Sequence, residues 1–127
     1  MESERPVRPR LLDILDAIHE IETHLAGKSF SEYAESTLLQ RAVERWLEII
    51  SEASRYIPDE WKLENPSVPW RAVADFGNVT RHVYQAISAI RVWQTATTEL
   101  ASLKGVCAHY YGLVKEPADP WPDAQSK

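Results

Sequence analysis

Apolar residues recur along most of this chain at steps of three and four positions, the spacing that places side chains on one face of a helix. A first apolar stripe covers residues 11–25 and is followed by Gly27, a residue type that commonly terminates helices. A longer stripe covers residues 39–57. We expect Ser36 to cap the helix that carries it and Pro58 to end that helix, because proline cannot continue the hydrogen-bond ladder.

Shorter signals divide the rest of the chain. Ser29 and Glu32 stand three residues apart, as in a capping box, and predict a short helix between the two long stripes. Residues 58–69 contain three prolines and predict a connection with room for one helical turn. The pattern then predicts a helix over residues 70–85 and a further helix capped by Ser88.

These elements predict an all-α fold, an antiparallel bundle of four to five helices. The chain has 127 residues and four glycines, and it lacks the period-two alternation of strands, so one helical domain accounts for it. We expect this domain to cover residues 1–115. Residues 116–127 combine three prolines with acidic and small residues and predict a disordered tail.

Charge and composition narrow the classes of function. The net charge of −5 argues against a protein that coats nucleic acid, and we expect no DNA partner. A single cysteine, Cys107, excludes an internal disulfide and a cysteine-based metal cluster. No apolar run is long enough to span a membrane, and the charged N-terminus lacks the apolar core of a signal peptide. We therefore expect a cytoplasmic protein.

Four phrases of the sequence, in this order and spacing, resemble one known family. They are "RLLDILDAIHEIETHLAGKSFSEY", "LLQRAVERWLEIISEASRYIP", "NPSVPWRAVADFGNVTRHVY" and "ISAIRVWQTATTELASLKG". Together they cover most of residues 10–107 and resemble the HepT-like branch of the HEPN superfamily. The resemblance implies an antiparallel helical bundle that pairs into a homodimer.

The resemblance also implies an activity and a partner. HepT-like toxins are ribonucleases of type VII toxin–antitoxin pairs that cleave RNA without a metal or another cofactor, in a cleft shared by two copies of the chain. Their antitoxin is a small MntA-like nucleotidyltransferase, which can transfer AMP to a tyrosine two residues after the catalytic histidine. The implied partners are therefore a second copy of the chain, this antitoxin and an RNA substrate.

The motif of the family matches this chain only in part. Asn78, His82 and Tyr84 fall on matching positions, and Tyr84 is the implied AMP acceptor. Gly77 stands where the family has an arginine. Arg81 lies four residues later, on the same face of a helix, and its side chain leans back toward the N-terminus, so it could serve as a substitute cation.

Each of these side chains suits one part of RNA cleavage. The ordinary pKa of histidine, about 6.5, allows His82 to accept or donate a proton near neutrality. Arg81 would hold the phosphate, and Asn78, one helical turn before His82, would orient the imidazole or the substrate. Glu52, within the family-like phrase "IISEA", would support an arginine or His82 at the cleft.

Other interpretations of the same residues stay open. Gly77 also fits a catalytically degenerate protein that keeps the homodimer and acts as a partner-binding module. Arg45, Glu48 and Glu52 follow one another at three- and four-residue steps, as in an ordinary salt-bridged helix surface. The remaining histidines, at positions 19, 24 and 109, have no ligand-like spacing, and we expect them to be solvated.

Overall fold

The computed structural model describes residues 6–76 and 85–115, and for residues 85–88 it describes the backbone alone. Helices account for most of these residues. No strand occurs in these residues, so the all-α class is confirmed. The predicted tail from residue 116 lies outside the described residues, and its disorder stays a prediction. None of the helices in the described part is long and apolar enough to cross a bilayer.

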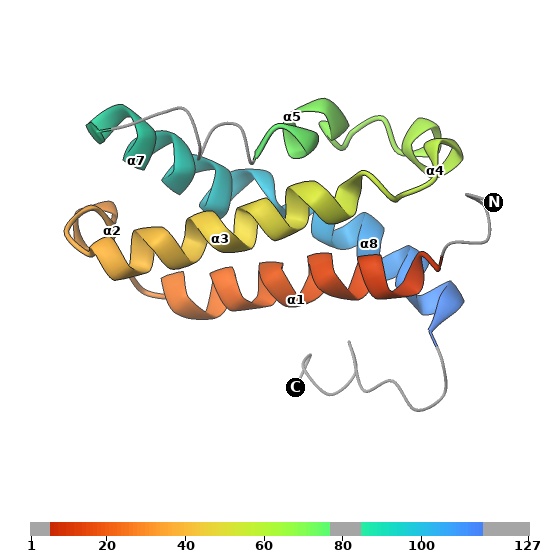
Figure 1. The fold of residues 1–127 in the computed structure, drawn as a ribbon, viewed down its shortest axis with the longest axis horizontal. Coiled ribbons are helices and arrows are strands. Elements are labelled where there is room, and N and C mark those ends of the chain that lie inside the picture. Colours follow the sequence, from red (N-terminus) through yellow and green to blue (C-terminus); the bar gives the residue numbers. More distant parts are fainter. Residues whose placement is uncertain (1–5, 77–84, 116–127) are drawn as a thin grey trace.

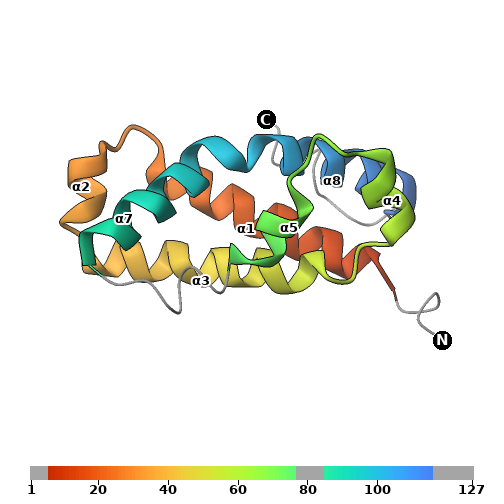
Figure 2. The ribbon, with the colours of Figure 1, turned by 90° about the horizontal axis from the view of Figure 1, so that it is seen from above.

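Three long stretches of helix form the body of the molecule (Figure 1). They are α1 (Arg8–Leu25), α3 (Thr37–Ser54) and α8 (Ala101–Val114). Helix α1 lies between the other two and runs antiparallel to both, as the view from above shows (Figure 2). Helix α8 continues from α7 (Gln85–Gln94) through a five-residue π-helical segment, η2 (Thr95–Glu99). The expected antiparallel bundle is therefore present.

Three short helices connect these stretches. Helix α2 (Phe30–Ala34) links α1 to α3, and α4 (Asp59–Glu64) fills the proline-rich connection. Helix α5 (Trp70–Ala74) follows and packs on α3. Helix α7 lies against α2 and α3, so the chain enters and leaves residues 77–84 from elements that both contact α3.

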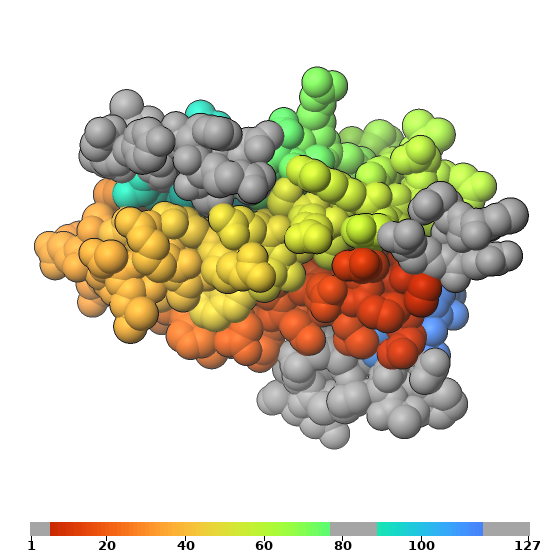
Figure 3. Space-filling model, in the orientation of Figure 1, coloured from red at the N-terminus to blue at the C-terminus, as the bar shows by residue number. Residues whose placement is uncertain are grey.

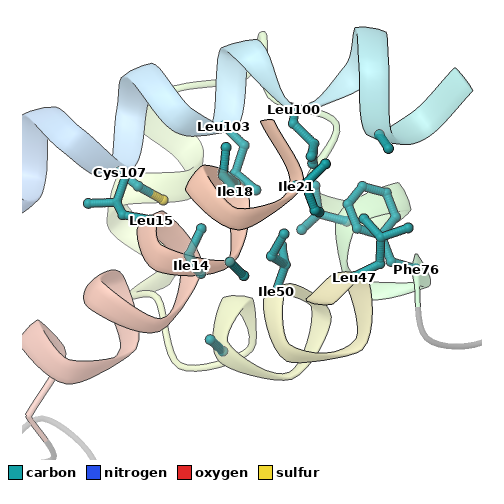
Figure 4. Packing of buried hydrophobic residues seen from close by; sticks show 14 of the residues in the cluster. Ile14, Leu15, Ile18, Ile21, Leu47, Ile50, Phe76, Leu100, Leu103 and Cys107 are labelled. Atoms are coloured by element: carbon teal, nitrogen blue, oxygen red, sulfur yellow. The ribbon is translucent and has the colours of Figure 1, made fainter. Parts of the chain in front are cut away.

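The core forms where the apolar stripes of α1, α3 and α8 meet (Figure 4). Every residue of the stripe predicted for α1 is buried. Figure 4 shows the central part of this packing, in which isoleucines and leucines of α1 contact the other two helices. The labelled members are Ile14, Leu15, Ile18 and Ile21 of α1, Leu47 and Ile50 of α3, and Phe76, Leu100, Leu103 and Cys107.

The helix boundaries predicted between the two long apolar stripes are confirmed. The Ser29 backbone N–H donates to Glu32 Oε1 at 2.8 Å, and the Glu32 N–H donates to Ser29 Oγ at 3.1 Å, which completes the capping box. Ser36 Oγ accepts from the Leu39 N–H at 3.1 Å and caps α3. Gly27 has a φ of 75°, a left-handed conformation that a residue with a Cβ adopts only with strain.

The prediction that Pro58 ends the long helix is wrong. Helix α3 ends at Ser54, and Pro58 instead precedes α4 as its N-cap. The backbone N–H groups of residues 55–57 each bond to a carbonyl three residues earlier, at 3.1–3.2 Å, so the chain tightens into turns before it reaches the proline. Ile57 remains buried, as the apolar stripe predicts.

Two boundaries in the second half also differ from the prediction. The helix expected over residues 70–85 is interrupted by a turn at Asp75, whose N–H is shared between the carbonyls of Arg71 and Ala72. Ser88 is no cap, because α7 already begins at Gln85. The π-helical segment η2 was not predicted. In and around it, the hydroxyls of Thr97 and Thr98 donate to carbonyls four residues earlier, at 2.7 and 2.6 Å.

Candidate functional site

Four of the five site residues predicted from the sequence, Asn78, Arg81, His82 and Tyr84, lie outside the described residues. Their roles therefore stay predictions. The structure does place both flanks of this segment, the buried Phe76 that ends the first and Gln85 that begins the second. It also places the helix that both flanks contact.

Side chains of α3 fix the first flank. Ser51 Oγ donates to the Ala74 carbonyl at 2.7 Å, and Arg55 Nη2 donates to the same oxygen at 3.2 Å. Ser51 is buried, whereas Arg55 is exposed. Ala74 is the last residue of α5, so Ser51 of α3 and Arg55, the C-cap residue that follows α3, both hold the end of α5.

Aromatic packing fixes the second flank. Trp93 of α7 lies edge-on to Phe30, with ring centroids 5.9 Å apart, and packs on Tyr33 at 5.4 Å. Tyr33 is fully buried, and its hydroxyl has no hydrogen-bond partner among the residues described. Burial, followed by the negative charge of Glu44, raises the pKa of Tyr33 far above its ordinary value, although Arg41 lowers it. This hydroxyl therefore stays protonated.

Charged residues line α3 between the flanks. Arg41 Nη1 contacts both carboxylate oxygens of Glu44, at 2.7 and 2.8 Å, and Arg45 Nη1 lies 3.3 Å from Glu48 Oε1. Among the described residues no carboxylate lies within ion-pair distance of Arg55. The salt-bridged surface predicted for Arg45 and Glu48 is thus confirmed, and Arg55, which follows α3, differs in this from the two arginines within the helix.

Glu52, the fifth predicted site residue, lies beside α1. Burial first, and then the charge of Glu52, raise the pKa of Asp13 above its usual value, against the opposing effect of Arg10. The Arg10 guanidinium itself lies 3.9 Å from the centroid of the Tyr56 ring. The structure thus places Glu52 near Asp13, and its role beside His82 stays a prediction.

His24 lies beside an open groove in the described part of the chain. His24 Nδ1 lies 2.8 Å from the Glu20 carbonyl oxygen, and its half-exposed ring packs on Trp46 at 5.1 Å. An open groove of about 590 Å³ passes this pair and the exposed Leu38. Helices α1 and α3 form much of the face shown in Figure 3. The groove is lined by residues of α1, the α1–α2 connection, α2 and the N-terminal part of α3, so it lies at the end of α3 opposite Arg55. Within the described residues no three His, Cys, Asp or Glu side chains converge on a common point.

These features define the class of the protein. It is an all-helical bundle in which a segment with the sequence pattern N-x-x-x-H-x-Y joins α5 and α7, two helices that contact α3. The family described as "Ribonuclease HepT-like" matches residues 14–110. This chain belongs to the HepT-like ribonuclease family of the HEPN superfamily.

Curated relatives support the same assignment. The chain is 37% identical over 95 residues to "Probable ribonuclease HepT" of Thermococcus cleftensis, covering 75% of this chain and 86% of the relative. It is 31% identical over 102 residues to "Putative RNase MJ1380" of Methanocaldococcus jannaschii, covering 80% of this chain and 94% of the relative. It is 31% identical over 97 residues to "Putative RNase TTE0752" of Caldanaerobacter subterraneus, covering 76% of this chain and 87% of the relative. No solved structure matches the chain significantly.

The hydrogen bond from Arg55 to the Ala74 carbonyl was not predicted from the sequence. The signal was present, because Ser51 and Arg55 stand four residues apart and thus share one face of the helix. What the sequence does not contain is the position of the Ala74 carbonyl, which depends on how α5 packs on α3.

Proposed function

We propose that this protein is an RNA-cleaving toxin of a type VII toxin–antitoxin pair, active as a homodimer and independent of metal. The observation that carries the proposal is the family match over residues 14–110, a range that includes Asn78, His82 and Tyr84. In this proposal the two copies of the segment 77–84 meet across the dimer and form one cleft for RNA.

The proposed reaction is an internal transfer at the RNA phosphate. The 2′-oxygen attacks the adjacent phosphorus, a new O2′–P bond forms, and the P–O5′ bond breaks to leave a cyclic phosphate and a 5′-hydroxyl. His82 of one copy accepts the 2′-hydroxyl proton, and His82 of the other donates a proton to the leaving oxygen. Arg81 binds the phosphate oxygens, and Asn78 orients the imidazole or the substrate. Glu52 would support these groups.

Regulation is the second part of the proposal. An MntA-like nucleotidyltransferase would bind the dimer and attach AMP to the hydroxyl of Tyr84, two residues after His82. A bulky, negatively charged group there would block the approach of RNA by steric exclusion and charge repulsion. We propose a cytoplasmic location for the pair.

A cleavage assay tests the catalytic part. Purified protein is incubated with tRNA and with mRNA in the presence of EDTA, beside the variants His82→Ala and His24→Ala. Loss of a general acid–base group typically costs about 10²–10⁴-fold in rate, so we expect His82→Ala to be inactive and His24→Ala to equal the parent. Equal activity of His82→Ala would eliminate this site.

A second candidate function rests on one residue. Gly77 replaces the arginine expected from the family motif, which favours a degenerate protein that retains its dimer and partner surface without catalysis. Expression without the nucleotidyltransferase separates the two functions. Growth arrest that disappears in His82→Ala supports the toxin, and normal growth together with no RNA cleavage supports the binding module.

A further inference from the structure

We propose that the groove beside His24 is one half of a contact between two copies of this chain, in which the same face of each copy packs on the other. This contact is additional to the RNA-cleaving pair proposed above and does not depend on its activity. Described residues of α1, the α1–α2 connection, α2 and the first half of α3 form the face. Its shape, one protruding leucine and its charges support the proposal.

An apolar stripe of α3 forms the floor of the groove. Leu38, Ala42 and Trp46 follow one another at steps of four residues, so they lie on one face of the helix. The small side chain of Ala42 between two large ones leaves a hollow, and the groove has an open volume of about 590 Å³. Trp46 is only half buried. A partner that covers this stripe would remove apolar surface from water.

Leu38 protrudes beside this hollow. Its side chain lines the groove, and 83% of the residue is exposed. A two-fold contact requires a surface that is complementary to itself, because each feature must meet its counterpart on the other copy. A protruding leucine beside an apolar hollow meets this requirement, since each copy can insert Leu38 into the hollow of the other.

The rim of the groove carries both signs of charge. Lys28 lies on the α1–α2 connection and Glu32 on α2, and both side chains line the groove. No ion pair joins them, and no carboxylate among the described residues lies within ion-pair distance of Lys28. Glu32 Oε1 accepts the Ser29 N–H at 2.8 Å, which leaves Oε2 for another donor. In a two-fold contact Lys28 of each copy would face Glu32 of the other and form two ion pairs.

A segment of an unrelated protein is the competing occupant of the groove. Such a partner would need the apolar hollow, but it would not need the same face to supply a matching protrusion. It would also not need one lysine and one glutamate on the same rim. The combination of hollow, protrusion and paired charges therefore favours a second copy of this chain.

The first experiment measures the mass of the full chain by sedimentation across a concentration series. Leu38 is the second residue of α3, whose first turn has no acidic side chain, so Leu38→Asp suits the helix dipole and should keep the fold, as circular dichroism can verify. Leu63 of α4 is 81% exposed and lies outside the groove, so Leu63→Asp is the matched control. We expect tetramers in the parent and in Leu63→Asp, and dimers in Leu38→Asp, whose Kd for this association should rise about 30-fold or more.

Charge reversal tests the pairing across the two-fold axis. Lys28→Glu and Glu32→Lys each place like charges opposite each other, so each variant alone should associate about tenfold or more weakly. An equal mixture of the two variants should form mixed assemblies, because every carboxylate then faces an ammonium. Fluorescent labelling of one variant reports this preference. Glu32→Gln keeps a side chain that the capping box accepts and controls for the loss of the box in Glu32→Lys.

Equal masses of the parent and Leu38→Asp, or no preference for mixed assemblies, would overturn this contact. RNA cleavage separates that failure from a failure of the proposed function. We expect Leu38→Asp to cleave RNA at the rate of the parent per chain, because the RNA-cleaving pair remains. A parent that cleaves no RNA but falls to half its mass in Leu38→Asp would refute the proposed function and support this contact.

Discussion

Replacing Tyr33 with phenylalanine should stabilise this protein, although the change removes a polar group and adds no contact. The ring of Tyr33 is fully buried between α2 and α7, where it packs on Phe30 and Trp93. Its hydroxyl has no hydrogen-bond partner within the described residues. In the unfolded chain the same hydroxyl bonds to water, so folding costs the free energy of removing it from water.

The magnitude follows from the cost of a buried, unsatisfied polar group, which is about 1–3 kcal/mol. Phenylalanine fills the same space except for one oxygen, so the ring contacts survive. We expect the free energy of unfolding to rise by about 1 kcal/mol or more, which for a domain of this size raises Tm by roughly 3–5 °C.

Tyr110 provides a matched control. Its hydroxyl donates to Glu64 Oε1 at 2.7 Å and accepts from Asn65 Nδ2 at 2.9 Å, while its ring stacks on Trp61 at 4.1 Å. Tyr110→Phe keeps the stacked ring and removes both hydrogen bonds. Because Glu64 is exposed, its carboxylate can hydrogen-bond to water in the variant. We therefore expect the free energy of unfolding to fall by about 1–2 kcal/mol.

The assay is urea unfolding of the parent and both variants, followed by circular dichroism at one protein concentration because a dimer would make stability concentration-dependent. The same chemical change should shift the midpoint upward at position 33 and downward at position 110. If Tyr33→Phe lowers the free energy of unfolding by more than about 1 kcal/mol, the hydroxyl makes a stabilising hydrogen bond and the prediction is refuted.

Three further predictions concern the core and two titrating groups. Ile18→Ala should lower the free energy of unfolding by about 2–5 kcal/mol, because a fully buried side chain leaves a cavity; a loss below about 1 kcal/mol in urea unfolding would contradict the packing. Burial raises the pKa of the Cys107 thiol to about 12, so this thiol should react with a thiol reagent only as the protein unfolds. Labelling of Cys107 in the native protein at the rate of free cysteine would disprove this prediction. Asp13, whose pKa burial raises, binds its proton more tightly in the folded state, so its contribution to stability is full at low pH and lost as the pH rises through the raised pKa. Asp13→Asn should therefore be more stable than the parent at neutral pH, and this advantage should shrink as the pH falls toward the ordinary carboxyl value of 3.8; an advantage that grows instead would reverse the argument.

Local signals predicted the first half of the fold well. The capping box of Ser29 and Glu32, the cap at Ser36 and the left-handed Gly27 each depend on residues within one helical turn. The buried face of α1 also follows from spacing alone, because a helix with one apolar stripe must turn it toward its neighbours.

Boundaries set by tertiary contacts were not predictable in the same way. The turn at Asp75 accompanies two hydrogen bonds that the Ala74 carbonyl accepts from the side chains of Ser51 and Arg55. These bonds join groups 19 and 23 residues apart in the chain, so no local pattern contains them.

The candidate site depends on two kinds of information. The family resemblance identified Asn78, His82 and Tyr84, and the family match supports the assignment to a ribonuclease family. The contact of Arg55 with the Ala74 carbonyl depends on the packing of α5 beside α3, which no local pattern contains. Glu52, chosen because its phrase matches the family, lies near Asp13 of α1, and its role beside His82 stays a prediction.

The most direct test of the account compares two oligonucleotides of identical sequence, one of RNA and one with 2′-O-methyl groups throughout, in the presence of EDTA. We predict that the parent protein cleaves only the RNA, leaves 2′,3′-cyclic phosphate ends, and loses this activity in His82→Ala. Cleavage of the 2′-O-methyl strand, undiminished cleavage by His82→Ala, or no cleavage of any RNA by the parent would contradict the central claim.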